Sequence, residues 1–262
     1  MQDTLWQVTE GDGPLVALAI HDGHSVRSEV AARLALDDDA RLREEDPYTA
    51  RWTALAPTRI VVSRSRFEVD LNRPRDRAVY REPSDAWGLD LWRSPLPDDL
   101  VERSLAQYDE FYATIHDVLE RVIRRAGQFV VYDLHSYNHR RDGPDAAPAD
   151  PDANPQVNLG TGSMDRQRWA PVVDRFVEGL RAWPFPGGGL DVRENVKFRG
   201  GHLSRWIHET FPGAGCALAI EFKKFFMDEW TGQPNEEAID AIGRALTATT
   251  TGVLDELPRC SG

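Results

Sequence analysis

Three short apolar segments of the sequence end in side chains that bind metals or transfer protons. The segments at residues 15–20, 129–134 and 216–220 run directly into His21, His135 and Glu221. Each segment has the length and composition of a buried strand in a parallel sheet. Because the carboxyl ends of parallel strands lie along one edge of a sheet, we expect these three side chains to meet at one site.

A metal site built from His and carboxylate ligands fits this pattern. The chain has two cysteines, Cys216 and Cys260, without Cys-x-x-Cys spacing, so the sequence indicates neither a thiolate zinc site nor a disulfide framework. Two or three His ligands with an open position are typical of catalytic zinc. A nearby Glu that is not a ligand can then act as a general base toward metal-bound water.

His24 is the third candidate ligand. It follows His21 by three residues in a Gly-containing turn, and this spacing lets both imidazoles reach one ion. We predict His21, His24 and His135 as ligands of one divalent ion and Glu221 as the general base. In the alternative interpretation, only His21 of the first pair binds the ion and His24 lines the cleft.

A fourth segment, residues 67–71, alternates like a strand and leads into Asn72 and Arg73. Asp70 within it is suited to accept a hydrogen bond from the second ring nitrogen of a ligating histidine, which fixes the tautomer of that histidine. The planar guanidinium of Arg73 is suited to bind a carboxylate through two hydrogen bonds. We therefore expect this segment to border the same site.

The remaining elements predict an α/β fold. Residues 59–63 are a further strand candidate, and helices are expected at residues 28–36, 98–125, 169–183 and 236–257. The densely charged residues 37–47 are expected to form a solvated loop, and the Pro- and Asp-rich residues 140–158 a long mobile loop. Since the 262 residues contain no convincing linker, we expect one domain spanning residues 1–262.

The composition limits the partners. A net charge of −12 argues against nucleic acid and anionic membranes, which bind basic surfaces, although a local Arg cluster still allows a small anionic substrate. No apolar run approaches the roughly 20 residues that span a membrane, and the N-terminus lacks the basic and apolar pattern of a signal peptide. A cytoplasmic location is therefore expected, and the oligomeric state is left open.

The order and spacing of these motifs resemble the N-formylglutamate amidohydrolases, a family within the zinc carboxypeptidase superfamily. The resemblance covers most of the chain and implies a three-layer αβα fold around a mixed, mostly parallel sheet with one zinc ion. The similar stretches are Ala-Ile-His-Asp-Gly-His at residues 19–24, Leu-Arg-Glu-Glu-Asp-Pro at 42–47, Glu-Val-Asp-Leu-Asn-Arg at 68–73, Asp-Leu-His-Ser at 133–136, Gly-Gly-His at 200–202, and residues 221–229.

The resemblance also implies roles for single residues at the metal. His21 and His135 match the two His ligands of the family, and Glu221 matches the general base. His24 stands where the related peptidases carry a Glu ligand.

Further residues match positions that contact the substrate. Asn72 and Arg73 correspond to the pair that binds the substrate carboxylate. Arg64 or Arg66 would stabilise the developing oxyanion, with Arg66 the preferred candidate. His202 would line the pocket, or it is an ordinary polar loop residue.

The implied activity is that of a zinc-dependent hydrolase acting on linear amide bonds. Its substrate would be a small anionic N-formyl or N-acyl amino acid such as N-formylglutamate, cleaved to formate and the free amino acid. A second cation, Lys223, Lys224 or Arg199, would bind a side-chain carboxylate. The alternatives are a zinc carboxypeptidase or deacylase that cleaves another amide with the same metal site, and a non-catalytic binding domain of the same fold.

Overall fold

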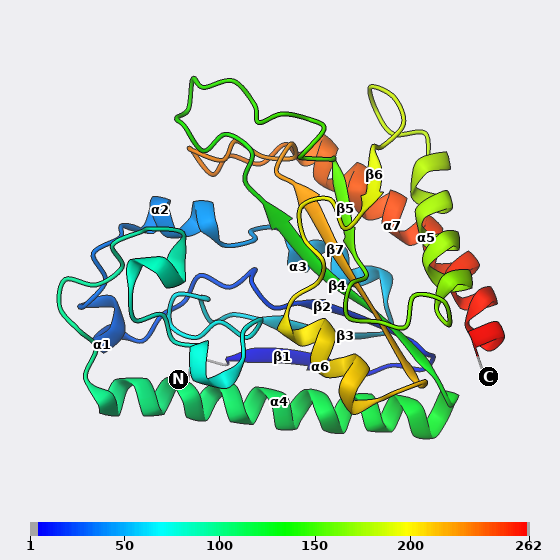
Figure 1. The fold of residues 1–262 in the computed structure, drawn as a ribbon, viewed down its shortest axis with the longest axis horizontal. Coiled ribbons are helices and arrows are strands. Elements are labelled where there is room, and N and C mark those ends of the chain that lie inside the picture. Colours follow the sequence, from blue (N-terminus) through cyan, green and yellow to red (C-terminus); the bar gives the residue numbers. More distant parts are fainter. Residues whose placement is uncertain (1–4, 261–262) are drawn as a thin grey trace.

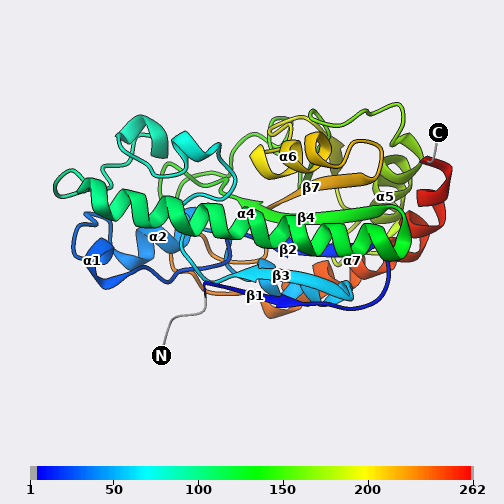
Figure 2. The ribbon, with the colours of Figure 1, turned by 90° about the horizontal axis from the view of Figure 1, so that it is seen from below.

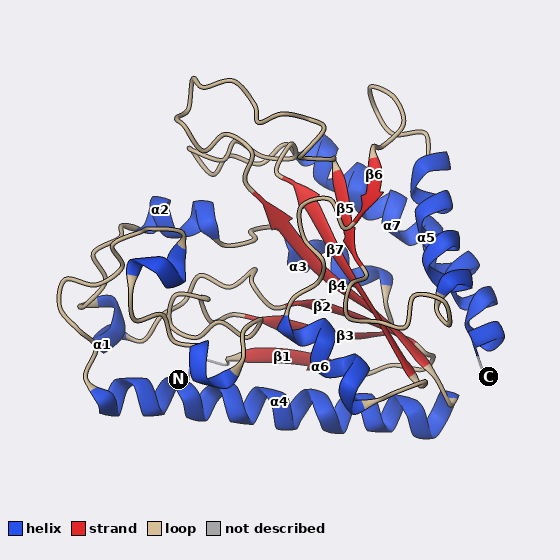
Figure 3. Ribbon diagram, in the orientation of Figure 1, coloured by secondary structure: helices blue, strands red, loops and turns tan. Residues whose placement is uncertain are grey.

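Seven strands form one mixed sheet at the centre of the computed structural model, which describes residues 5–260 (Figure 1, Figure 3). The strands are β1 (Trp6–Thr9), β2 (Leu15–Ala19), β3 (Thr58–Val62), β4 (Phe129–Tyr137), β5 (Val157–Gly160), β6 (Val192–Glu194) and β7 (Gly215–Lys223). Their order across the sheet is β1-β3-β2-β4-β7-β5-β6. The β1–β3 and β5–β7 pairs are antiparallel, and the other neighbouring pairs are parallel.

Helices cover both faces of this sheet. The α-helices of the described residues are α1 (Ser28–Ala31), α2 (Asp38–Glu44), α3 (Thr49–Trp52), α4 (Asp98–Ala126), α5 (Ala170–Ala182), α6 (His202–Thr210) and α7 (Glu236–Glu256). Helices α4 and α6 pack on one face and α5 and α7 on the other, which gives three layers (Figure 1, Figure 2). The predicted three-layer αβα fold is therefore confirmed.

Strand β2 shows how a continuous apolar run serves both cores. Leu15 and Ala17 belong to the core under α5 and α7, whereas Val16 and Leu18 belong to the core under α4 and α6. Successive side chains of a strand point to opposite faces of the sheet, so a strand covered on both faces needs apolar residues throughout. All five residues of β2 are buried.

The long helix α4 has ends that its sequence specifies. It begins after Pro97, carries two aspartates in its first turn, and stops at Gly127, whose φ of 79° lies in the left-handed region. Phe111, Ile115 and Val118 recur at helical spacing and are fully buried against the sheet. Burying one such side chain contributes about 1.5–3 kcal/mol.

Most predicted elements are present, but the predictions for residues 67–71, 28–36 and 37–47 are wrong. Residues 67–71 form buried turns rather than a strand. Phe67 packs in a separate small cluster with Leu34 and Tyr80, whereas Val69 packs in the core under α4 and α6. The apparent alternation therefore comes from a turn between two cores. The helix predicted at residues 28–36 is limited to Ser28–Ala31.

Residues 37–47 are not a solvated loop. They contain α2, and Glu44, Glu45 and Asp46 are 5%, 0% and 2% exposed. The Asp37 side chain accepts a hydrogen bond from the Ala40 backbone and caps the helix. The charged side chains at the end of this segment therefore lie inside the protein rather than in solvent.

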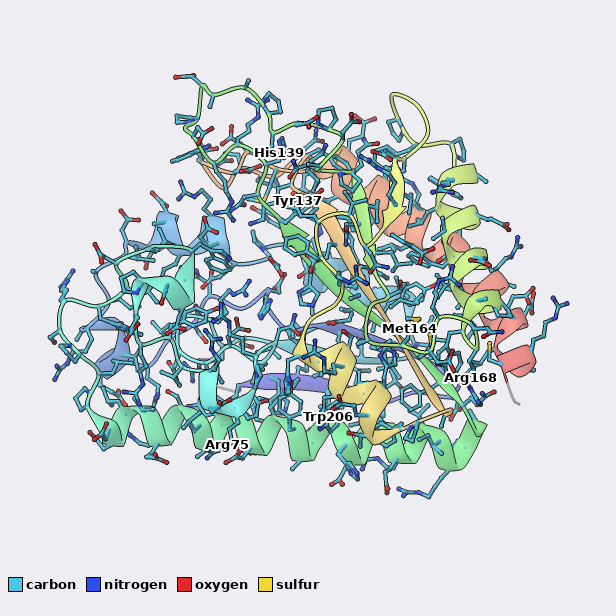
Figure 4. All side chains as sticks on the ribbon, in the orientation of Figure 1. Arg75, Tyr137, His139, Met164, Arg168 and Trp206 are labelled. Carbon is cyan, nitrogen blue, oxygen red and sulfur yellow. The ribbon has the colours of Figure 1, made fainter. Side chains whose placement is uncertain are left out.

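Of the loop predicted at residues 140–158, residues 140–156 contain no helix or strand, whereas residues 157 and 158 begin β5. The loop lies beyond the end of β4 at the top of Figure 1. Glu229 accepts hydrogen bonds from the backbone N–H groups of His139, labelled in Figure 4, and Arg140 at 2.7 and 3.1 Å. This carboxylate ties the start of the loop to the segment after β7, and mobility of the loop stays a prediction.

No helix among residues 5–260 is long and apolar enough to cross a membrane, and the cytoplasmic location also stays a prediction.

Candidate active site

The carboxyl ends of β2, β4 and β7 meet along one edge of the sheet (Figure 3). His21 lies two residues beyond β2. His135 lies in β4 directly opposite Glu221 of β7. The parallel register therefore brings together the three side chains that the sequence placed at strand ends.

His21, His135 and Asp46 form a buried group. Nδ1 of His21 lies 3.4 Å from Oδ2 of Asp46, and Nδ1 of His135 lies 3.1 Å from the same oxygen. One ligand atom from each residue lies within 4.8 Å of the others. This group could hold a metal ion through two imidazole nitrogens and one carboxylate oxygen, a donor set that suits zinc and other borderline divalent metals.

Two further carboxylates lie against the imidazoles. Oδ1 of Asp70 lies 2.7 Å from Nε2 of His21, and Oδ1 of Asp133 lies 2.9 Å from Nε2 of His135. A proton on Nε2 of His21, donated to Asp70, leaves the Nδ1 lone pair of that ring directed toward Asp46. The contact between His135 and Asp133 is close but lacks hydrogen-bond geometry. Carboxylates in this position are usual around metal-binding histidines, and Asp70 lies where the sequence suggested it would.

One orphaned atom supports the fit of a metal to this group. Nδ1 of His21 is buried and has no hydrogen-bond partner among the described residues. Buried polar atoms without a partner are rare in folded proteins. An ion coordinated by this nitrogen and by Asp46 would satisfy both.

Charges within the group perturb the pKa values of its members. Burial would raise the pKa of Asp46, but His135 and His21 outweigh it and hold that pKa well below its usual range. Burial would also raise the pKa of Asp70, which Arg66 and His21 instead hold well below normal. Burial would lower the pKa of His135, but nearby carboxylates hold it well above normal, so a metal must displace a proton from this ring.

His24 lies outside the His–Asp–His group. Its Nδ1 is 2.5 Å from Oε2 of Glu45, its Nε2 is 3.0 Å from the Arg41 guanidinium, and 37% of its side chain is exposed. The prediction that His24 is the third ligand therefore does not fit the structure. The turn after α2 places Asp46 beside His21 and His135 instead. His24 contacts Glu45, the residue before Asp46.

Glu221 is a carboxylate without a partner. Its side chain forms no hydrogen bond or ion pair within residues 5–260. Burial raises the pKa of Glu221 to about 7, and the charges of Asp46 and Asp133 add to the shift while His135 opposes it. A carboxyl group with a pKa near neutrality can both accept and donate a proton.

A cavity of about 350 Å³ opens onto these residues, a size that suits a small molecule. Its wall includes the His–Asp–His group and Glu221. The cations that line it are Arg66, Arg141, Lys197, Arg199 and Lys224.

Three of these cations, Lys197, Arg199 and Lys224, form no ion pair with a carboxylate among the described residues. Arg199 forms no side-chain hydrogen bond or ion pair there. Lys197 donates to the amide oxygen of Asn154 at 2.6 Å. Nζ of Lys224 donates to two backbone oxygens instead. Lys223, by contrast, donates to the backbone oxygen of Asn154 and does not line the cavity.

Arg66 lines the cavity but is strongly held. Its Nη2 is 3.0 Å from Oδ2 of Asp70, its Nε is 3.3 Å from the Tyr80 hydroxyl, and its guanidinium lies 4.9 Å from the Trp87 ring centre. These contacts fix the guanidinium beside the His–Asp–His group. Arg64, the other oxyanion candidate, is not among the lining residues.

Asn72 lies in the cavity wall in a defined orientation. Its Oδ1 accepts a hydrogen bond from the Leu203 backbone at 3.0 Å, which leaves Nδ2 as a donor for a ligand. A Cβ at Gly201 would lie 2.2 Å from this amide oxygen, so only glycine allows α6 to begin this close to Asn72.

Arg73 and His202 are not among the residues that line the cavity. Nη2 of Arg73 donates to the backbone oxygen of Asp85 at 2.6 Å, and its guanidinium lies 4.6 Å from the Tyr80 ring centre. The His202 ring packs against Tyr112 at 5.8 Å. The structure therefore brings Asn72, but neither of these two predicted residues, into the cavity wall.

Comparison with known proteins decides the family. Residues 13–227 match the family model for N-formylglutamate amidohydrolase. The chain belongs to the N-formylglutamate amidohydrolase family. A search of curated proteins found no significant match.

Solved structures share the fold. The crystal structure of an N-formylglutamate amidohydrolase from Ralstonia eutropha JMP134 is 18% identical, with a TM-score of 0.75 over 97% of this chain and 98% of that chain. A gene product from Agrobacterium tumefaciens is 17% identical, with a TM-score of 0.67 over 94% of each chain. Family membership confirms the resemblance found in the sequence, and the chain is an N-formylglutamate amidohydrolase-like hydrolase.

Lys197 in the cavity wall and two carboxylates beside the histidines were missed by the sequence analysis. Asp46 lies in the charged segment at residues 37–47, although Glu-Glu-Asp-Pro contributed to the family resemblance. Asp133 carried a local signal that was not used: it precedes His135 by two residues in one strand, so both side chains point to the same face.

Proposed function

We propose that the protein is a zinc-dependent amidohydrolase that cleaves an N-formyl amino acid, such as N-formylglutamate, to formate and the free amino acid. The observation that carries this proposal is the unpartnered carboxylate of Glu221, with its pKa raised to about 7, in the same cavity as the buried His–Asp–His group. Family membership supports the choice of substrate.

His21, Asp46 and His135 would hold the ion, and Asp70 and Asp133 would keep both imidazoles oriented. A divalent ion bound there polarises a carbonyl group and lowers the pKa of water. The burial of all three ligand side chains limits competing water.

Glu221 acts first as a base and then as an acid. Its carboxylate accepts a proton from the attacking water as the new C–O bond forms at the formyl carbon. It then delivers that proton to the amide nitrogen as the C–N bond breaks, which releases formate and the free amine. Arg66, held by Asp70 and Tyr80, stabilises the negative charge that develops on the carbonyl oxygen.

The cations of the cavity wall select an anionic substrate. Nδ2 of Asn72 and the guanidinium of Arg199 are donors without protein partners among the described residues, and together they would bind the α-carboxylate. Lys197 would bind a side-chain carboxylate. We assign Arg199 the role that the sequence suggested for Arg73, because Arg73 is held away from the cavity by Asp85.

The test is formate release from a panel of N-formyl amino acids with acidic, neutral and basic side chains, alongside their N-acetyl counterparts. We expect N-formylglutamate to be cleaved fastest, with activity lost on chelation and restored by Zn²⁺. Cleavage of the N-acetyl compounds or of peptides in preference to formyl compounds would indicate a deacylase or carboxypeptidase instead. A zinc-loaded protein that cleaves none of them would overturn the proposal.

A further inference from the structure

Lys224 is a buried cation that the proposed chemistry does not use. It directly follows β7 and is 1% exposed. Its Nζ donates to the backbone oxygens of Arg43 at 2.5 Å and Glu45 at 2.6 Å, and within residues 5–260 it forms no ion pair with a carboxylate. Burying an ammonium group is costly even when it is hydrogen-bonded, so its retention here needs a reason.

The two carbonyl groups belong to the turn that delivers Asp46. His21 and His135 are placed by strands, whereas Asp46 is the second residue after α2 and has no strand to hold it. The Glu45 carbonyl belongs to the peptide bond that joins Glu45 to Asp46. The N–H of that same peptide bond donates to the backbone oxygen of His21 at 2.9 Å.

Both polar atoms of the peptide before Asp46 are therefore fixed, one by His21 and the other by Lys224. The backbone N–H of Lys224 in turn donates to the oxygen of Tyr137 at 3.0 Å, which continues the pairing of β4 with β7. Lys224 thus connects the Asp46 turn to the two strands that carry His135 and Glu221.

A second anchor holds the opposite side of this turn. One oxygen of the Glu45 carboxylate accepts a hydrogen bond from the Ser65 hydroxyl and lies close to the Arg41 guanidinium. The other oxygen contacts Nδ1 of His24. This anchor ties the turn to the segment after β3. It does not tie the turn to β4 and β7, so Lys224 supplies a separate constraint.

We propose that Lys224 is a positioning residue whose ammonium group fixes the Glu45–Asp46 peptide and thereby sets the position of the Asp46 carboxylate between His21 and His135. This inference rests on the proposed metal-binding role of these three residues. It predicts that Lys224 controls metal affinity without contacting the metal.

Lys224→Met and Lys223→Met form a matched pair for the test. Lys223 is the neighbouring lysine and also donates to a backbone carbonyl, that of Asn154 at 2.9 Å, but it does not line the cavity. Zn²⁺ affinity is measured by competition with a chromophoric chelator, and the visible spectrum of the Co²⁺-loaded protein reports the coordination geometry. We expect Lys224→Met to lower Zn²⁺ affinity by about 10–100-fold and to change the Co²⁺ spectrum, with Lys223→Met unchanged.

Lys224→Gln covers the case in which Lys224→Met does not fold, because its amide retains an N–H donor, and we expect the same loss to a smaller degree. A folded Lys224 variant with wild-type Zn²⁺ affinity and a wild-type Co²⁺ spectrum would overturn the inference while leaving the proposed function intact. If the wild-type protein itself binds neither ion, the metal-dependent function fails and the inference fails with it.

Discussion

Replacing Glu221 by Gln removes the proposed proton carrier while keeping the size of the side chain. The Glu221 carboxylate has no hydrogen bond or ion pair within residues 5–260, so the change leaves no protein group unsatisfied. The fold and the metal affinity should therefore be retained. Loss of a general base costs about 10²–10⁴-fold in kcat, which corresponds to about 2.7–5.4 kcal/mol of transition-state stabilisation.

The assay compares initial rates of formate release by the metal-loaded wild type, Glu221→Gln and a control, Glu237→Gln. Glu237 is exposed in the first turn of α7 and does not line the cavity. We expect kcat to fall for Glu221→Gln alone, with KM little changed and a thermal midpoint at or above that of the wild type, because a partly buried charge is lost. A Glu221→Gln protein with full metal content and kcat within tenfold of the wild type would refute Glu221 as the base.

Three further predictions address pH, substrate binding and the core. Activity should fall as the pH drops through a midpoint at or below 7. Burial raises the pKa of Glu221 to about 7, and a bound cation would lower that pKa. A midpoint well above 7 would exclude Glu221 as the base. Arg199→Met should raise KM for N-formylglutamate about 10-fold or more with little change in kcat, since a charged hydrogen bond contributes about 1.5–3 kcal/mol; an unchanged KM in steady-state assays would remove Arg199 from the carboxylate site. Phe111→Ala should lower the free energy of unfolding by about 3–5 kcal/mol in denaturant titrations and leave KM unchanged, because Phe111 of α4 is fully buried against the sheet and does not line the cavity.

The parts of the site that lie on strands could be predicted from the sequence. His21, His135 and Glu221 follow or end apolar runs, of which the one before His135 is interrupted by Asp133. The parallel order of β2, β4 and β7 brings such positions together. The long periodic helices α4 and α7 were equally clear, because their buried faces repeat at helical spacing over many residues.

Asp46 could not be predicted by the same logic. It lies on a turn in a segment so rich in charge that composition alone indicated solvent exposure. The end of this segment is buried because its polar groups are paired with residues far away in the sequence. Lys224 binds two of its backbone oxygens, and the two histidines contact the Asp46 carboxylate. Pairings across such sequence separations leave no periodic signal.

The short elements were missed for a related reason. Strands β1, β5 and β6 have four, four and three residues, too few to show a period of two. Helix α6 begins directly after Gly200 and Gly201, which are typical of loops. Only the contact between Gly201 and Asn72 reveals why glycine is needed there.

The central claim is that His21, Asp46 and His135 hold one divalent ion. The most direct test is the metal content per chain, by elemental analysis after Zn²⁺ loading and dialysis, of the wild type, Asp46→Ala and His24→Gln. We predict one ion per chain in the wild type and in His24→Gln, and far less than one in Asp46→Ala. Full occupancy in Asp46→Ala together with loss of the ion in His24→Gln would contradict the account and return the third ligand to His24.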